Sequence, residues 1–428
     1  MKVTAIIAEY NPFHNGHAYQ IEQIRQATDA DAILVIMSGD FVQRGTPAIY
    51  DTYTRARAAL VCGVDVVIEL PVYFATGSAE YFAAGAVTLL NQLNCVDTLC
   101  FGCECENLSL LSQIADILAD EPAVFGEILR SRLKKGQSFP AAREEALWNF
   151  LQLSENLPPH LSREMLSHLL GSPNNILAIE YLKQLKRTHA TIRPYAIKRQ
   201  GSGYLDINRV TSMPSAMAIR TMLSEGLQPI DLAHCMPPAA LSVLRDAHGA
   251  FGPVYCDDFA VMLHYQLVTG QEQGFAGYLD CTQDLSNKIC KHLPDYRNFT
   301  AFAESLWSQD ITTARIYRCL IHILLRLRKE EMETLQETGL IHYARILGIG
   351  NQPQTSELTS SLKVHSQIPL LTKVSKAASL LSPVGNASLQ KDLLANSIYR
   401  IALSQKTKKT VPDSSRRLFL KLLCGEEH

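Results

Sequence analysis

Long hydrophobic runs and a strong net charge are both missing from this 428-residue sequence. No stretch of 18 consecutive apolar residues occurs, so we expect no membrane-spanning helix. The apolar run from Val3 to Ala8 is too short for a signal peptide, and charge follows it at once. The formal net charge is −2, so a polyanionic partner would have to bind a local basic patch. These absences predict a protein without a membrane partner.

The dense cysteine spacing of small secreted proteins is also missing. Eleven cysteines are scattered over the chain, a pattern typical of reduced thiols in a cytoplasmic protein. Cys95, Cys100, Cys103 and Cys105 do cluster, but they do not form two separated CxxC pairs. Alternate residues of a strand also point to opposite faces, so we favour reduced thiols over zinc and assign no metal site.

The sequence does have the pattern of an α/β domain. Short apolar runs separated by helical segments predict buried strands at residues 3–8, 32–37, 64–70, 96–102 and 192–199. Strands that alternate with helices of this length form parallel sheets with right-handed crossovers. We therefore predict a Rossmann-like, parallel five-stranded sheet.

The length predicts more than one domain, and the strand pattern fades after Met236-Pro237-Pro238. We place a catalytic domain at residues 1–235. Residues 236–428 are expected to form a mostly helical extension, with a loop-like stretch from Gly348 to Ser356.

A polar motif follows the first predicted strand and opens a helix. It reads EYNPFHNGH and spans Glu9 to His17. The loop after the first strand of a parallel sheet is where such folds bind nucleotides, and Gly16 and the helix N-terminus favour phosphate there. His14 and His17 are spaced so that both imidazoles project to one side and can stabilise charge on the α-phosphate of ATP. We predict that these two histidines are catalytic; the alternative is a polar turn with two surface histidines.

This motif is the signature of the HxGH nucleotidyltransferase superfamily, and a narrower resemblance follows it. The chain resembles the bacterial tRNA(Met) cytidine acetate ligase family in six segments that occur in the same order: EYNPFHNGH, MSGDFVQRG (37–45), GVDVVIELP (63–71), Phe101-Gly102, KKGQSFPAAR (134–143) and SPNNILAIEYL (172–182). The resemblance covers at least residues 1–225. It implies the HxGH nucleotidyltransferase fold.

The resemblance also implies the reaction. Acetate and ATP would give acetyl-adenylate, and the acetyl group would pass to N4 of the wobble cytidine of elongator tRNA(Met), forming N4-acetylcytidine. ATP would be a substrate, and magnesium is expected to accompany it. Two alternatives stay open: a small-molecule adenylyltransferase, and an RNA-binding protein with a relic nucleotide fold. The implied partners are tRNA, ATP and acetate, and no protein partner can be named.

The expected ATP-binding residues come from the motif and from the resemblance. Ser215 would cap a helix whose Arg220 points back at the triphosphate, although Met217 stands where related sequences often carry a hydroxyl. The full set is Ile7, Ala8, Glu9, Tyr10, Asn11, Pro12, Phe13, His14, Asn15, Gly16, His17, Gln20, Gly102, Asn174, Arg199, Ser215 and Arg220.

Four charged residues near the second and third predicted strands have more than one interpretation. Asp40 and Arg44 follow the second strand and could form a substrate loop or an ordinary solvated loop. Arg55 and Arg57 lie in an otherwise apolar helix; they could face the catalytic site, but we favour surface positions.

The end of the chain is basic. Residues 361–428 carry eleven Lys and Arg against four acids, a local charge of +7. Candidate tRNA-binding residues there are Lys406, Lys408, Lys409, Arg416 and Arg417. A second basic segment upstream contains Arg315, Arg318, Arg326, Arg328 and Lys329. Both segments could bind an RNA backbone or could be solvated surface.

Overall fold

The computed structural model of the chain describes residues 1–105, 107–154, 158, 161–198, 213–411 and 420–421. The chain divides into two compact units. Unit 1 comprises Met1–Asp97 and Gln200–His428, and unit 2 comprises Thr98–Arg199.

Unit 1 is built on a sheet in which β1 (Val3–Ala8), β2 (Ala32–Ser38) and β5 (Val66–Leu70) run parallel. Ala8 lies opposite Met37, and Ser38 lies opposite Leu70, so these strands end at the same edge. Every residue of β2 and β5 is buried, as expected for strands covered on both faces. The three strands predicted in this part of the sequence are therefore confirmed.

The same sheet continues with strands from the far end of the chain. β8 (Ala344–Ile349) pairs antiparallel with β5, and β9 (Leu370–Leu371) and β10 (Leu420–Lys421) pair parallel with β8. The expectation of a purely parallel, five-stranded sheet was wrong, because β8 is an additional, antiparallel strand. The expectation of a loop beginning at Gly348 was also wrong, because β8 extends to Ile349. β8 covers the edge of β5, which would otherwise present unpaired backbone groups.

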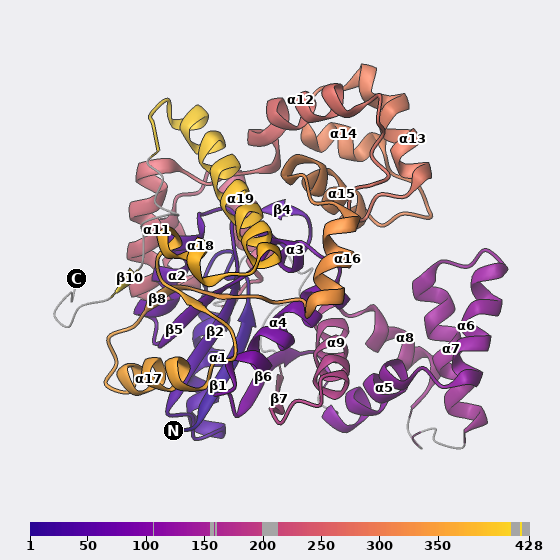
Figure 1. Cartoon of the computed structure of the whole chain (residues 1–428), viewed down its shortest axis with the longest axis horizontal. Coiled ribbons are helices and arrows are strands. Elements are labelled where there is room, and N and C mark those ends of the chain that lie inside the picture. The colour runs from indigo at the N-terminus through magenta and orange to yellow at the C-terminus, as the bar shows by residue number, and fades with distance from the viewer. Residues whose placement is uncertain (106, 155–157, 159–160, 199–212, 412–419, 422–428) are drawn as a thin grey trace. The chain divides into compact units, whose positions relative to one another are not determined.

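Helices surround this sheet and extend the unit (Figure 1). The long helix α19 contacts α3, α11 and α15, so the end of the chain packs against its beginning. A two-stranded hairpin, β3 (Phe41–Val42) and β4 (Thr46–Pro47), follows β2. The helices are α1 (Asn15–Ala27), α2 (Thr52–Val61), α3 (Val72–Ala75), α4 (Ala79–Leu93), α10 (Ala216–Ser224), α11 (Pro238–Phe251), α12 (Ala260–Gly270), α13 (Gln283–His292), α14 (Phe299–Ser305), α15 (Thr313–Leu325), α16 (Lys329–Thr338), α17 (Thr355–His365), α18 (Ala377–Leu380) and α19 (Pro383–Thr407). Short 3₁₀ turns are η1 (Pro229–Cys235), η2 (Cys256–Phe259), η3 (Leu293–Asp295) and η4 (Val374–Lys376).

Unit 2 contains the remaining two predicted strands, β6 (Thr98–Cys103) and β7 (Arg193–Lys198), paired in parallel. Between them lie α5 (Leu108–Asp120), α6 (Ala123–Lys134), α7 (Phe139–Leu153), α8 (Arg163–Gly171) and α9 (Pro173–Arg187). All five strands expected from the sequence are therefore present, and the mixed α/β fold is confirmed.

The proline pair at residues 237–238 lies inside unit 1. Met236 is buried in a core cluster with Ile49, Ile219 and Leu232. Pro238 is the first residue of α11, a position that suits proline because the amide there needs no partner within the helix. The prolines therefore begin a helix within a compact unit, and the functional division into residues 1–235 and 236–428 stays a prediction.

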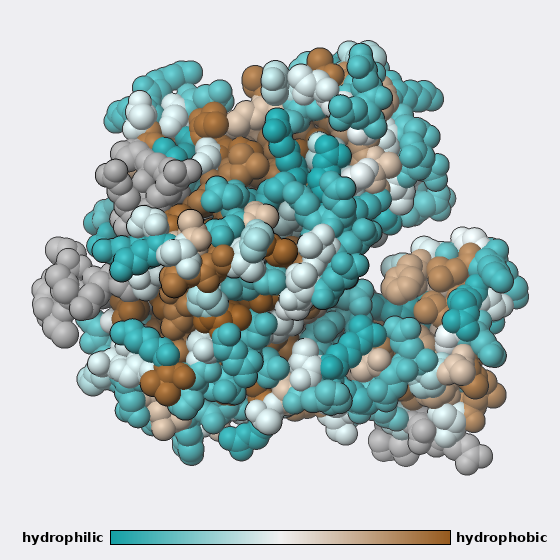
Figure 2. Space-filling view, in the orientation of Figure 1, coloured by the Kyte–Doolittle hydropathy of each residue, from teal (hydrophilic) through white to brown (hydrophobic). Residues whose placement is uncertain are grey.

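The visible surface is largely hydrophilic, with hydrophobic side chains gathered in small patches, one of them over α17 (Figure 2). Within the part of the chain that the structure describes, the helices are all too short or too polar to span a lipid bilayer.

Candidate active site

The HxGH loop connects β1 to α1, and His14 is the N-cap of α1. The Gly16 amide donates to Nδ1 of His14 at 3.0 Å, and the His14 amide donates to Nδ1 of His17 at 3.2 Å. Both Nδ1 atoms are therefore acceptors, which places the ring hydrogen of each neutral imidazole on Nε2. The backbone thus sets both histidines as Nε2–H donors.

The two imidazoles lie side by side, as the spacing predicted. Their ring centroids are 3.7 Å apart and the rings are nearly parallel, at 23°. The His17 ring also contacts Tyr10 at 4.8 Å and Phe13 at 5.5 Å. A Cβ at position 16 would lie 2.9 Å from Cε1 of His14, so this stacking itself requires glycine there. The loop is packed around its histidines.

Further contacts within unit 1 hold the HxGH loop. Asn11 Oδ1 accepts a hydrogen bond from the Ile49 amide at 2.9 Å, and the Asn11 carbonyl accepts one from Arg220 Nη1 at 2.7 Å. Ser215 caps α10, with its Oγ accepting from the Ala218 amide at 3.1 Å. The predicted Ser215–Arg220 motif is therefore brought to the HxGH loop, where Arg220 bonds to the loop backbone.

Asp40 precedes the β3–β4 hairpin, and Arg44 lies in its turn. Asp40 is buried; its Oδ1 accepts from the amide and hydroxyl of Thr52 at 2.8 and 2.7 Å, and its Oδ2 accepts from Asn396 Nδ2 at 2.7 Å. These contacts give Asp40 the surroundings of an internal anchor rather than those of a substrate loop. Arg44 is half-buried in the hairpin turn. Gly45 beside it has φ +74° and packs against the backbone of α15 at Arg318.

The expected surface position was wrong for Arg55. Its side chain is fully buried, at 0% exposure, because its guanidinium bonds to backbone carbonyls at the edge of the sheet. Burial lowers the pKa of Arg55, and nearby Asp40 opposes that shift. Arg57, two residues further along α2, is half-buried.

A buried ionic cluster at the end of β5 was not foreseen. Glu69 Oε2 pairs with Arg345 Nη1 at 2.7 Å, and Arg345 Nη2 donates to the Tyr53 hydroxyl at 2.9 Å. Asp392 accepts from the Val72 amide at 2.8 Å and from the Tyr343 hydroxyl, and burial raises the pKa of Asp392 to about 7. The only signal in the sequence was an isolated glutamate in the apolar run VVIEL of β5, because its partner Arg345 lies 276 residues away.

In unit 2 the predicted nucleotide-binding residues Gly102 and Asn174 lie on β6 and in the first turn of α9. Asn174 Nδ2 donates to Glu104 Oε1 at 2.6 Å, and the Asn175 amide donates to Glu104 Oε2 at 3.0 Å. Neither asparagine is the N-cap of α9, which is Ser172. The Glu104 carboxylate satisfies the helix amide instead. Arg199 lies outside the described residues.

The cysteine cluster has the surroundings of protonated thiols. Burial raises the pKa of Cys95 and that of Cys103 to about 11 each. The Cys103 thiol donates to the carbonyl of Cys105. Over the described ranges of the chain, no group of three His, Cys, Asp or Glu side chains is arranged to hold a metal ion.

The C-terminal lysines differ in their surroundings. Lys406 Nζ donates to the Pro253 carbonyl at 2.7 Å and pairs with Asp258 at 2.9 Å. Lys408 and Lys409 are exposed beyond the end of α19. Arg416 and Arg417 lie outside the described residues. All three described lysines of this group are exposed to solvent, and Lys406 differs in being paired with Asp258.

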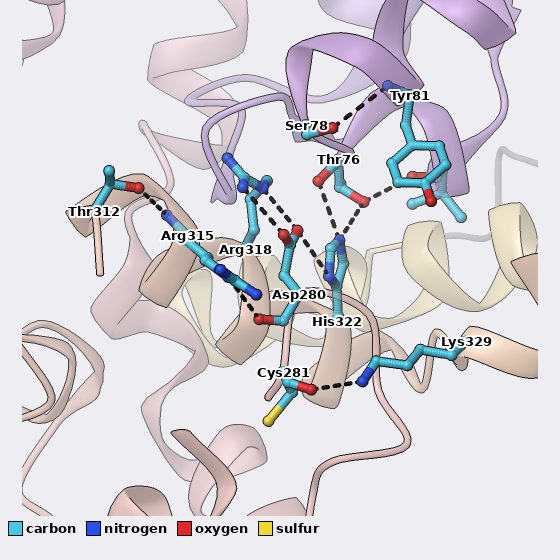
Figure 3. A network of polar contacts seen from close by, with 11 residues as sticks. Thr76, Ser78, Tyr81, Asp280, Cys281, Thr312, Arg315, Arg318, His322 and Lys329 are labelled. Carbon is cyan, nitrogen blue, oxygen red and sulfur yellow. Dashed lines mark hydrogen bonds and ion pairs between the residues drawn. The ribbon is translucent and has the colours of Figure 1, made fainter. Parts of the chain in front are cut away.

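The upstream basic segment is mostly bonded inside unit 1. In Figure 3, Arg318 and His322 of α15 both point toward Asp280. Arg318 Nε lies 2.8 Å from Asp280 Oδ2, and the Arg315 guanidinium donates to the Asp280 carbonyl at 3.2 Å. Lys329 Nζ donates to the carbonyls of residues 276 and 281, and Arg328 lies over the Tyr278 ring at 3.8 Å. Much of this positive charge is therefore used within the fold.

Comparison with known proteins places the chain in a family of nucleotidyltransferases. The family described as HIGH Nucleotidyl Transferase matches residues 1–413. A tRNA(Met) cytidine acetate ligase of Halothermothrix orenii is 37% identical over 422 residues, covering 97% of each chain. One of Acetivibrio thermocellus is 36% identical over 403 residues, covering 93% of this chain and 94% of the relative.

Solved structures of Thermotoga maritima TmcAL are also similar over nearly the whole chain. The form bound with alpha-thio ATP has a TM-score of 0.89 and 28% identity, and covers 99% of this chain and 100% of that one. The apo form has a TM-score of 0.91 at the same identity and coverage. The resemblance seen in the sequence is thereby confirmed. The chain belongs to the HIGH nucleotidyltransferase family and, within it, to the tRNA(Met) cytidine acetate ligases.

Proposed function

We propose that this protein is an ATP-dependent ligase that activates acetate and acetylates N4 of the wobble cytidine of elongator tRNA(Met). The observation that carries the proposal is the stacked pair of Nε2–H donors at the start of α1, in a chain that matches ligases of this name over almost its full length. The full-length match favours the ligase over a small-molecule adenylyltransferase. An enzyme acting on tRNA would work in the cytoplasm.

The reaction has two steps. An acetate oxygen attacks the α-phosphorus of ATP, the bond from that phosphorus to the bridging oxygen breaks, and pyrophosphate leaves. The cytidine N4 then attacks the acetyl carbonyl of acetyl-adenylate; AMP leaves and the amine loses a proton. The mixed anhydride is needed because acetate is a poor acyl donor and the cytosine amine is a poor nucleophile.

His14 and His17 would act by electrostatic stabilisation. Each presents a hydrogen on Nε2 that can be donated to a phosphate oxygen as charge develops on the α-phosphate and on pyrophosphate. Their orientation is set in advance by backbone amides, so little reorganisation is needed in the transition state. No covalent nucleophile is required, because positioning and charge stabilisation carry this chemistry.

The remaining nucleotide contacts are proposed from the motif and the family. They are residues 7–17, Gln20, Gly102, Asn174, Arg199, Ser215 and Arg220. Arg220 already bonds to the Asn11 carbonyl, so it would support the HxGH loop as well as the triphosphate. Of the two predicted substrate-loop residues, Asp40 is less suited than Arg44 to bind a substrate, because Thr52 and Asn396 already bond to its carboxylate oxygens.

Magnesium would enter with ATP. The described residues offer no cluster of three His, Cys, Asp or Glu side chains for a metal, so the ion would be held by phosphate oxygens and water. Among the described candidates for tRNA binding, Lys408 and Lys409 are best placed to meet a phosphate backbone. Lys406 is bonded to Asp258, and it would contribute less.

The test is incubation of the protein with ATP, labelled acetate and unmodified elongator tRNA(Met), followed by nucleoside analysis. We expect label only in N4-acetylcytidine, release of AMP that depends on tRNA, and acetate-dependent exchange between ATP and pyrophosphate without tRNA. A tRNA transcript with uridine at the wobble position is the matched control and should take up no label. Label in another nucleoside, or exchange that is indifferent to acetate, would contradict the proposal.

A further inference from the structure

Arg55 connects the carboxyl ends of two neighbouring strands. It lies in the second turn of α2, and its guanidinium donates to carbonyls beyond β1 and β2. Nη1 donates to the Glu9 carbonyl at 2.6 Å and to the Ser38 carbonyl at 3.1 Å. Nη2 donates to the Ser38 carbonyl at 3.1 Å and to the Gly39 carbonyl, while Nε donates to the Tyr50 carbonyl at 2.9 Å. All three guanidinium nitrogens are thus bonded to the backbone.

The strand ends need such a donor because their carbonyls leave the sheet ladder where Ser38 and Gly39 are buried and Glu9 is half-buried. β1 ends at Ala8 and β2 at Ser38, so the carbonyls of Glu9 and Gly39 lie just beyond the paired register. A buried carbonyl without a partner costs about 1–3 kcal/mol. The planar guanidinium carries five donors in a fixed fork, whereas a lysine ammonium is a single compact centre. Only arginine can serve this set of carbonyls from one position.

The same contacts fix the HxGH loop at two places. Glu9 is the first residue of that loop, and its carbonyl is held by Arg55. Tyr50, also held by Arg55, follows Ile49, whose amide bonds to the Asn11 side chain within the loop. Arg55 therefore determines where the loop leaves the sheet and where its neighbouring segment lies. The loop geometry in turn sets the positions of His14 and His17.

The contacts of Arg55 are backbone contacts rather than an ion pair. Its side chain is fully buried, and across the described part of the chain no carboxylate forms a salt bridge with it. A residue with these partners can act on the reaction only through the loop that it holds.

We propose that Arg55 is a positioning residue for adenylate formation: it holds the HxGH loop so that His14 and His17 meet the phosphates, without touching the nucleotide. This inference rests on the proposed function, since it concerns the first step of that reaction.

The test compares Arg55→Lys and Arg55→Met with the matched control Arg57→Met on the same helix. For each folded variant, the number of ATP-competent sites and the Kd for ATP are measured by calorimetry, and kcat per competent site by acetate-dependent ATP–pyrophosphate exchange. We expect kcat per site to fall about a hundredfold in Arg55→Met and about tenfold in Arg55→Lys, because a small displacement of catalytic groups has effects of this size. The Kd for ATP should change far less, and Arg57→Met should retain both values.

Two results would overturn the proposal. A purely structural role would lower the melting temperature or the number of competent sites while leaving kcat per site at the wild-type value in both variants. A purely electrostatic role would give Arg55→Lys the wild-type kcat, since lysine keeps the buried charge. If Arg55→Met does not fold, Arg55→Lys alone decides. A wild-type protein without acetate-dependent exchange would instead refute the proposed function, which separates that failure from the failure of the Arg55 proposal.

Discussion

Unit 1 contains two histidine sites that differ in how their rings are bonded. At the HxGH loop, backbone amides bond to Nδ1 of His14 and of His17, and both partners are local in sequence. His322 of α15 is fully buried, with Nε2 at 3.2 Å from the Thr76 hydroxyl and 3.1 Å from the Thr76 carbonyl, 246 residues away. Its Nδ1 lies 3.7 Å from Asp280 Oδ2 (Figure 3).

The two sites differ in which groups bond to each ring nitrogen. Because a carbonyl can only accept, the contact with Thr76 places the hydrogen of the neutral His322 ring on Nε2, directed at the protein backbone. The His322–Thr76 contact joins α15 to the segment before α4, and the bond from Arg318 to Asp280 joins α15 to the segment before α13. In the proposed function the HxGH pair donates its ring hydrogens to phosphate oxygens, whereas the ring hydrogen of His322 is bonded to Thr76.

The largest effect should follow from changing the HxGH pair itself. In His14→Asn or His17→Asn, loss of one phosphate donor should lower kcat for ATP–pyrophosphate exchange by about 10²–10³-fold. Asparagine is a good N-cap, so His14→Asn should change the free energy of unfolding by less than about 1 kcal/mol. Exchange rates and urea unfolding measure the two quantities. The control is His189→Asn, an exposed histidine with φ 49°, a conformation that asparagine tolerates. A wild-type exchange rate in either HxGH variant would show that the changed histidine is not needed for adenylate formation.

The second largest effect should be one of stability at the His322 group. Asp280→Asn leaves the Arg318 guanidinium, whose side chain is 11% exposed, without its charged partner. We expect the free energy of unfolding to fall by about 3 kcal/mol, as when one member of a buried pair is removed. Urea denaturation measures the loss, and kcat per ATP-competent site should stay at the wild-type value. Asp246→Asn, at an exposed position, should shift stability by less than about 0.5 kcal/mol. A drop in kcat per site in Asp280→Asn would give this group a catalytic role.

His322→Leu should have a smaller effect on stability at pH 8. The change leaves the hydroxyl and carbonyl of Thr76 without the ring, which should cost about 2 kcal/mol of unfolding free energy. Urea denaturation again measures the cost. An unchanged stability would show that Thr76 finds another partner and that the histidine is dispensable to the fold.

The smallest effect should appear in the pH dependence. Burial lowers the pKa of His322 below its usual value of 6.5, although Asp280 opposes the shift. The unfolded chain then takes up this proton before the folded one, so the stabilising contribution is complete above about pH 6.5 and is lost as the pH falls below it. His322→Leu lacks this contribution. The stability gap between wild type and His322→Leu should therefore narrow between pH 7 and pH 5, by at most about 1.4 kcal/mol per pH unit. A gap that widens in acid would mean that Asp280 raises the pKa instead.

The parts that the sequence predicted depend on neighbours along the chain. The strands at residues 3–8, 32–38 and 66–70 were visible because burial on both faces demands continuous apolar runs. The HxGH geometry was visible because the contacts of His14 and His17 span only two or three residues.

The parts that the sequence did not predict depend on distant partners. Arg55 has the composition of a surface residue, and only the carbonyls of Glu9 and Ser38 explain its burial. β8 has an apolar run like those of the other strands, but it lies among helices, and its pairing with β5 crosses most of the chain. The Glu69–Arg345 pair has the same origin. In each case the partner is distant in sequence and becomes a neighbour only when the chain folds.

The pairing of β5 with β8 also has a consequence for synthesis on the ribosome. β5 is complete at Leu70, but β8 begins only at Ala344, and α19, which supplies Asp392 to the Val72 amide, comes later still. At a translation rate of about 5–20 residues per second, the nascent chain carries an uncovered strand edge for roughly tens of seconds. A product released early by a premature stop codon would keep that edge exposed, which makes it a target for chaperones and proteases.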